Sequence, residues 1–294
     1  MTPTTFKHAV ARSLLPLACA VMATTGALAQ TSTPTEAAVP GATTTTTTMT
    51  APDGRVIDVT VIAPVAPRGV VLFSHGGNSN PLATTALHAR LTARGFAVIA
   101  PTHTDSQSLP PERQTSLMAA FTTRVTDMRM AAGYAGQAFP GLPVAQVGYS
   151  FGSLISLIGG GAFASMVPGS NPGVKAVVMF SSPGPIPLLT NAPGGFDGVK
   201  GPTLLVTGDA DKVPGFAEDP AAHLIYFDNL PAGDHTALVV ADATHAFLGA
   251  KQPGWDEVAA IVDDFLVSRV LDDGAAAARF DALTSNAMVT VKRK

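Results

Sequence analysis

The chain has 294 residues and a net charge of −3, with 46% hydrophobic and only 13% charged residues. So low a charged fraction excludes a disordered acidic or basic protein, because such chains are rich in charge and poor in apolar residues. Lys and Arg are scattered without a basic stripe, which argues against a nucleic-acid partner. No apolar run reaches the roughly 18 residues of a membrane-spanning helix, so the sequence does not predict an integral membrane protein.

The first 29 residues have the pattern of an export signal. Basic residues precede an apolar stretch from Leu14 to Ala23, and the small residues Ala27-Leu28-Ala29 follow it. This order is typical of a signal peptide, with cleavage expected after Ala29. The alternative is a buried N-terminal helix. We therefore expect a periplasmic or secreted protein.

The only cysteine, Cys19, lies within this predicted leader. The mature protein is therefore expected to have neither a disulfide nor a thiol nucleophile. A lipid anchor on Cys19 is the weaker alternative, because Pro16 stands where a lipobox prefers Leu. Residues 30–50 are rich in Thr, Pro and Ala without helical or strand periodicity, and we interpret them as a disordered linker. A single folded domain is predicted for 51–294.

Short apolar runs bounded by Gly or Pro alternate with longer stretches of helical spacing through this domain. Uncharged runs rich in Val and Ile suit strands that are buried on both faces. Their alternation with helices predicts an α/β fold with a parallel sheet wound on both sides. The expected strands are 57–62, 70–73, 97–100, 144–147, 174–180, 203–206 and 236–240, and the expected helices are 84–93, 117–132, 151–159 and 255–271.

Gly148-Tyr149-Ser150-Phe151-Gly152 matches the pattern G-x-S-x-G. The motif directly follows one predicted strand and directly precedes a predicted helix. A turn this tight strains the backbone at the serine, and the flanking glycines avoid Cβ clashes across it. We therefore predict Ser150 to be a nucleophile, against the alternative of a serine in an ordinary loop.

A serine hydroxyl needs a base within hydrogen-bond reach, and the base needs a carboxylate to orient it. Of the seven histidines, His245 alone follows the last predicted strand in a loop that can return over the sheet. His245 is therefore the predicted base. For the acid, Asp209 and Asp211 compete after the strand 203–206, and Asp211 is preferred because it reaches farther along its loop. Asp242 is a third candidate.

An oxyanion site requires backbone N–H groups directed at the position where negative charge develops. The amide of Phe151, at the start of a helix, is one predicted donor. The second is expected in Ser74-His75-Gly76-Gly77-Asn78, with the amide of Gly77 preferred because glycine permits close approach of a substrate. His75 could serve only to orient this loop.

These motifs together resemble the α/β-hydrolase superfamily over residues 55–270. Phe73–Gly77 and Val98–His103 are further similar to the dienelactone-hydrolase-like and platelet-activating-factor-acetylhydrolase-like esterases, although true dienelactone hydrolases have cysteine where this chain has Ser150. The resemblance implies an α/β-hydrolase fold and hydrolysis of carboxylic esters through an acyl-enzyme. It also implies small-molecule or polymeric ester substrates.

Many relatives insert a helical lid at the position of residues 181–202. This segment is short and rich in Pro and Gly here, so we expect a loop and an open cleft, with Leu188 and Leu189 as wall residues. The alternatives in function are a serine peptidase or amidase and a binding protein without activity. The chain has no H-E-x-x-H, P-loop, G-x-G-x-x-G or paired cysteines, and His103 and Asp105 are too few for a metal site, so neither cofactor nor metal is predicted.

Overall fold

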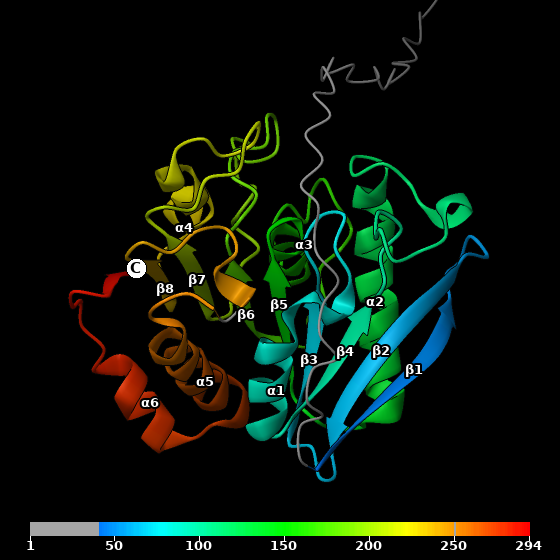
Figure 1. The fold of residues 1–294 in the computed structure, drawn as a ribbon, viewed down its shortest axis with the longest axis horizontal. Helices are drawn as coiled ribbons and strands as arrows, with labels where there is room; N and C mark the ends of the chain where they lie inside the picture. Colours follow the sequence, from blue (N-terminus) through cyan, green and yellow to red (C-terminus); the bar gives the residue numbers. More distant parts are fainter. Residues whose placement is uncertain (1–40, 250) are drawn as a thin grey trace, which may run out of the picture. The chain divides into compact units, whose positions relative to one another are not determined.

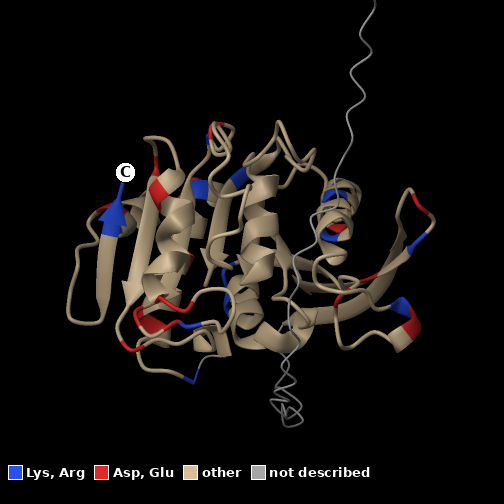
Figure 2. Ribbon diagram, turned by 90° about the horizontal axis from the view of Figure 1, so that it is seen from above, with Lys and Arg blue, Asp and Glu red and all other residues tan. Residues whose placement is uncertain are grey.

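The computed structural model describes residues 41–249 and 251–294, which belong to one compact unit. The predicted signal peptide, residues 1–29, and the first part of the predicted linker, residues 30–40, lie outside the described residues. Among the described residues, no helix is long and apolar enough to cross a membrane. Figure 2 shows the Lys, Arg, Asp and Glu residues distributed over several elements rather than collected on one.

A nine-stranded sheet forms the centre of this unit, in the order β1-β2-β4-β3-β5-β6-β7-β8-β9 (Figure 1). The six strands from β4 to β8 in this order are parallel, whereas β1, β2 and β9 pair antiparallel at the two edges. The strands are β1 Ala42–Thr50, β2 Val56–Pro64, β3 Gly69–Ser74, β4 Phe96–Pro101, β5 Val144–Tyr149, β6 Val174–Phe180, β7 Thr203–Gly208, β8 His235–Val240 and β9 Val289–Arg293.

Helices cover both faces of the sheet and divide the core into two clusters. On one face lie α1 and α5, with α6 packed on α5; on the other lie α2, α3 and α4. Every residue of β3, β4 and β7 is buried, as expected for parallel strands covered on both sides. The α-helices are α1 Thr85–Ala93, α2 Ala120–Ala138, α3 Phe151–Gly159, α4 Ile225–Asn229, α5 Trp255–Leu271 and α6 Gly274–Asp281, and the 3₁₀ turns are η1 Pro81–Thr84, η2 Pro111–Arg113, η3 Pro220–Leu224 and η4 Phe247–Gly249.

The prediction of a disordered linker over residues 30–50 is wrong for its second part, because Ala42–Thr50 forms the edge strand β1. Its residues pair antiparallel with β2 along their whole length, from Ala42 opposite Pro64 to Thr50 opposite Val56. Threonine is β-branched and therefore suits a pleated strand, and its polar hydroxyl can be solvated by water at an exposed sheet edge. A uniform run of threonines has no polar and apolar alternation, so periodicity could not reveal this strand. All the strands and helices that the sequence predicted are present. Besides β1, the elements α4, α6 and β9 were not predicted.

Residues 181–202, between β6 and β7, contain turns and no helix. This confirms the expectation of a loop rather than a large helical lid. The loop is anchored by the ring of Phe196, which is buried and lies edge-on to Phe163 at 4.9 Å between centroids. Leu188, in contrast, is 70% exposed. The carboxyl ends of β5, β7 and β8 are therefore not covered by a helical insertion from this segment.

Candidate active site

The order of the strands reverses beside β3, because the chain passes from β3 to β4 on one side and then crosses to β5 on the other. In open parallel sheets, ligands bind outside the carboxyl ends of the strands at such a reversal. Two of the predicted motifs lie there: the loop from His75 to Asn78 follows β3, and Ser150 follows β5. The topology therefore brings both motifs to one place.

Ser150 occupies the tight turn that the sequence predicted. Its backbone has φ 53° and ψ −121°, and α3 begins at the next residue. A side chain at Gly148 would overlap the carbonyl oxygen of Gly152, and a side chain at Gly152 would overlap that of Ser74. Gly148 thus allows the sharp turn from β5 into α3, and Gly152 allows the start of α3 to lie against the end of β3, which explains their spacing around the serine.

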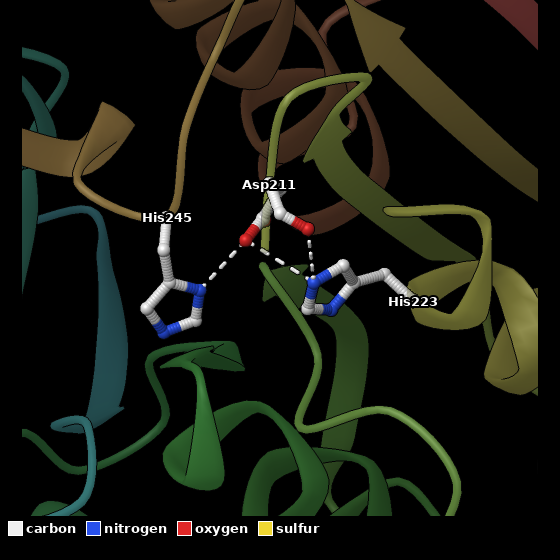
Figure 3. Close-up of side chains that lie close together, drawn as sticks. All are labelled: Asp211, His223 and His245. Atoms are coloured by element: carbon white, nitrogen blue, oxygen red, sulfur yellow. Dashed lines mark hydrogen bonds and ion pairs between the residues drawn. The ribbon is translucent and has the colours of Figure 1, made fainter. Parts of the chain in front are cut away.

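His245 and Asp211 extend from Ser150 in a connected chain of hydrogen bonds. The Oγ of Ser150 lies 3.1 Å from Nε2 of His245, whose Nδ1 lies 2.8 Å from Oδ1 of Asp211 (Figure 3 shows the two latter residues). The carboxylate can only accept, so Nδ1 carries the proton and Nε2 is free to accept from the serine. Asp211 is fully buried, while the side chain of His245 is 26% exposed. The site is therefore solvent-accessible at the serine and closed at the acid.

Asp209 and Asp242, the two other candidates for the acid, make no hydrogen bond to the side chain of His245 among the described residues. Asp209 accepts a hydrogen bond from the backbone N–H of Asp242 at 2.7 Å. Asp242 itself is exposed and has a positive φ of 56°. Both acids shape the junction between the loops that follow β7 and β8, whereas Asp211 contacts the imidazole.

Asp211 has a second histidine partner that the sequence did not indicate. His223, in η3, lies with its Nε2 3.1 Å from Oδ1 of Asp211, and the hydroxyl of Thr207 donates to Oδ2 at 3.1 Å. Burial opposes ionisation of the carboxyl, but the hydrogen bonds and charges of His223 and His245 outweigh it and hold the pKa of Asp211 well below its usual range. Asp211 is thus an ionised carboxylate at neutral pH. No strand end precedes His223, so no sequence signal could have found it.

The loop after β3 lies directly beside the serine. A Cβ atom added to Gly76 would lie 3.6 Å from the Cβ of Ser150. Among the described residues, no group accepts a hydrogen bond from the backbone N–H of Gly77 or of Phe151. Both predicted oxyanion donors therefore belong to segments that adjoin Ser150, and neither amide is paired with another group of the described residues.

A buried guanidinium supports this loop from α2. Arg124 is fully buried and donates to the carbonyl oxygens of His75 at 2.7 Å and Gly76 at 2.9 Å. Asp105 binds it through two hydrogen bonds of 2.8 Å each and also accepts from the N–H of Asn78 at 2.7 Å. Arg124 and Asp105 thus hold both sides of Gly77, a role of both residues that no motif in the sequence predicted.

His75 and His103 complete the support beneath the loop. The Nδ1 of His75 lies 2.8 Å from the carbonyl oxygen of Gly76, and its Nε2 accepts from the N–H of His103 at 3.1 Å. Burial, together with the positive charge of Arg124, lowers the pKa of His75 well below its usual value, so the ring is neutral. His103 bridges Asp127 and Ser74 at 2.8 and 2.9 Å. His75 therefore orients the loop, which was the alternative that the sequence left open.

One group of metal-ligating side chains gathers in the described part of the chain: Asp211, His223 and His245. Their separations of 2.8 and 3.1 Å are hydrogen-bond distances, and protons shared between nitrogen and oxygen account for them. We therefore interpret the cluster as a hydrogen-bonded assembly.

Comparisons with known proteins bear on the fold. No protein-family model and no curated protein matches the sequence. Among solved structures, the chain is similar to a PEG-bound cold-adapted esterase from an Arctic intertidal metagenomic library, with a TM-score of 0.59 and 16% identity over 78% of this chain and 95% of that one. The native and zinc-bound structures of a cold-adapted esterase from such a library each give a TM-score of 0.56 at 17% identity, covering 78% and 79% of this chain and 95% of theirs. These likenesses show an α/β-hydrolase fold.

Proposed function

We propose that the protein is an exported serine hydrolase that cleaves carboxylic esters through an acyl-enzyme. The observation that carries this proposal is the continuous chain from the Oγ of Ser150 through His245 to the buried Asp211. Ser150 stands at a strained turn, which leaves its hydroxyl at the carboxyl edge of the sheet. An ordinary loop serine would require none of these features.

The geometry supports the following reaction. Ser150 attacks the ester carbonyl carbon while His245 takes the hydroxyl proton at Nε2, and Asp211 stabilises the resulting imidazolium. The N–H groups of Gly77 and Phe151 bind the oxyanion of the tetrahedral intermediate. His245 then returns the proton to the departing alcohol, which leaves Ser150 acylated. Water, activated by the same histidine, releases the acid and regenerates the serine.

Three similar structures of cold-adapted esterases favour ester over amide substrates. The segments Phe73–Gly77 and Val98–His103 further support a position near the dienelactone-hydrolase-like and platelet-activating-factor-acetylhydrolase-like esterases. We propose small-molecule or polymeric esters as substrates.

A chain-length series of p-nitrophenyl esters, assayed beside peptide anilides, tests the proposal on the wild type and on Ser150→Ala. Turnover of esters but not of anilides is expected, and Ser150→Ala should lower kcat by several orders of magnitude. A loss of tenfold or less in a folded variant would contradict the role of Ser150. Faster turnover of anilides would indicate a peptidase or amidase instead.

Export is tested separately from activity. The basic, apolar and small-residue segments of residues 1–29 support a cleaved signal peptide. Amino-terminal sequencing of the protein recovered from the periplasm or the medium should begin at Gln30. Recovery of uncleaved protein from the cytoplasm would contradict the proposal.

A further inference from the structure

The ring of His223 is fully buried, and each of its nitrogens faces oxygen atoms. Nδ1 lies against the backbone carbonyl oxygen of Ser182. Nε2 lies 3.0 Å from the backbone carbonyl oxygen of Asp211 and 3.1 Å from the carboxylate Oδ1 of the same residue (Figure 3). Carbonyl and carboxylate oxygens accept hydrogen bonds and cannot donate them.

A neutral imidazole cannot satisfy these surroundings. It carries one N–H, so either tautomer would direct a nitrogen lone pair at oxygen acceptors, and the ring has no solvent-exposed surface through which bulk water could compensate. Only the imidazolium, with a proton on both nitrogens, pairs with Ser182 on one side and with Asp211 on the other. We propose that His223 is held as an imidazolium in the resting protein, and that this fixed charge makes it a positioning residue that lowers the basicity of His245.

The shared carboxylate carries the effect from one histidine to the other. His245 donates its Nδ1 proton to Oδ1 of Asp211, the same oxygen that His223 contacts. The two rings are nearly parallel, with centroids 6.0 Å apart. A proton on Nε2 of His245 would thus create a second cation on one carboxylate, which like-charge repulsion opposes. In the proposed function, on which this step rests, His223 keeps His245 neutral and able to accept the proton of Ser150 at lower pH.

The other groups around the two histidines are accounted for. Apart from each other, the titratable side chains of the described residues in hydrogen-bond, ion-pair or ring contact with His223 or His245 are Asp211 and Tyr149. Tyr149 donates its hydroxyl to the carbonyl oxygen of His245, and burial together with the charge of Asp211 raises its pKa, so it stays neutral. Burial alone would lower the pKa of His223, but the hydrogen bond and charge of Asp211 outweigh it and raise that pKa.

The charge state can be measured without any substrate. We expect ¹H–¹⁵N NMR of histidine-labelled wild type to show both nitrogens of His223 protonated from pH 6 to 8, with the signals assigned by their loss in His223→Gln. Should that variant fail to fold, Ser182→Ala identifies the same signals, because it removes the hydroxyl that donates to the carbonyl oxygen of His223 at 2.8 Å. One bare nitrogen on His223 at pH 7 would overturn the proposal whether or not the protein hydrolyses esters.

The pH profile tests the effect on His245. In His223→Gln, the acid limb of kcat/KM for a p-nitrophenyl ester should move to higher pH by about 0.5 to 2 units, the range expected for one charge near 6 Å. Thr207→Val is the matched control, because it removes a hydrogen bond from an uncharged donor to Oδ2 of Asp211. Thr207→Val should lower kcat but shift the acid limb of the kcat/KM profile less than His223→Gln does. An unmoved limb in folded His223→Gln would show that the role is structural only.

Discussion

Arg124 shows at the scale of a single residue how the proposed oxyanion loop is held. Its side chain is fully buried and donates two hydrogen bonds to carbonyl oxygens of the loop and two to Asp105. A buried charge is costly unless it is paired and hydrogen-bonded. Arg124 and Asp105 meet that requirement only while the loop keeps its present shape, so the ion pair and the position of the Gly77 amide depend on each other.

Removal of either partner should therefore affect both stability and turnover. Arg124→Met and Asp105→Asn are each expected to lower the free energy of unfolding by about 3–5 kcal/mol, because each leaves a buried partner uncompensated. We expect kcat to fall by up to about 100-fold as the oxyanion donor loses its position. Urea denaturation and ester kinetics measure the two effects.

The double variant sharpens this test. Arg124→Met with Asp105→Asn should cost less than the sum of the single changes, since both members of the pair are then neutral. Arg129→Met on the exposed face of the same helix is the control and should change stability little. Additive losses would contradict a coupled pair.

Gly152 provides a second prediction at this scale. Gly152→Ala introduces a Cβ into the carbonyl oxygen of Ser74, so we expect a loss of about 1–3 kcal/mol in the free energy of unfolding together with lower kcat. Gly136→Ala is a matched control in α2, where an added Cβ meets nothing within 4 Å. That change should be neutral or stabilising by up to about 1 kcal/mol. Equal effects of the two substitutions would show that no close approach exists at Gly152.

At the scale of elements, β1 completes one edge of the sheet. Met49 and the following Ala51 are buried in the core on the α2 side. Without β1, the full length of β2 would become an edge strand with unpaired N–H and C=O groups. The threonine tract therefore belongs to the fold.

Truncation tests this role of β1. A chain that begins at residue 52 is expected to unfold at lower urea concentration than a chain that begins at residue 30, and to aggregate more readily, because it exposes β2 and the cavity left by Met49. Urea denaturation and light scattering of the two chains measure the difference. Identical stability would show that β1 contributes nothing to the sheet.

At the scale of the whole molecule, several buried histidines link stability to pH. Burial lowers the pKa of His88 to about 4 and that of His103 well below its usual value, the latter with a further contribution from Arg124. The unfolded chain binds these protons near pH 6.5, whereas the folded chain does not, so stability is lost as pH falls from 6.5 towards 4. Asp127 has the opposite effect on stability. Burial raises its pKa to about 6, so the folded chain binds this proton at a higher pH than the unfolded chain does, and this contribution to stability grows as pH falls below 6.

His88→Leu isolates one of these contributions. The ring of His88 packs edge-on to Phe73, and a leucine can occupy the same apolar site without titrating. We expect wild type to lose up to about 3 kcal/mol relative to this variant between pH 6.5 and 4. Urea denaturation at several pH values gives the comparison. Parallel stability curves for the two proteins would contradict a neutral His88 in the folded state.

The sequence by itself determined the elements whose residues carry a local signal. Buried parallel strands are uninterrupted apolar runs, and the turn at Ser150 accepts only glycine at positions 148 and 152. The strands and the turn could therefore both be predicted from the chain. The order of the motifs along the chain also led to Asp211 and His245. The strand runs and the glycine spacing depend on neighbours in sequence, and the candidates Asp211 and His245 depend on their positions after successive predicted strands, so the sequence alone indicated them.

Only the tertiary structure decided which distant side chains share a site. Arg124 and Asp105 come from α2 and from the loop after β4, and His223 reaches Asp211 from a 3₁₀ turn. None of these positions has a motif, because their partners are set by packing between elements. The strand β1 escaped prediction for a related reason: a row of identical threonines has no periodicity, and its conformation is fixed by the hydrogen bonds that β2 offers.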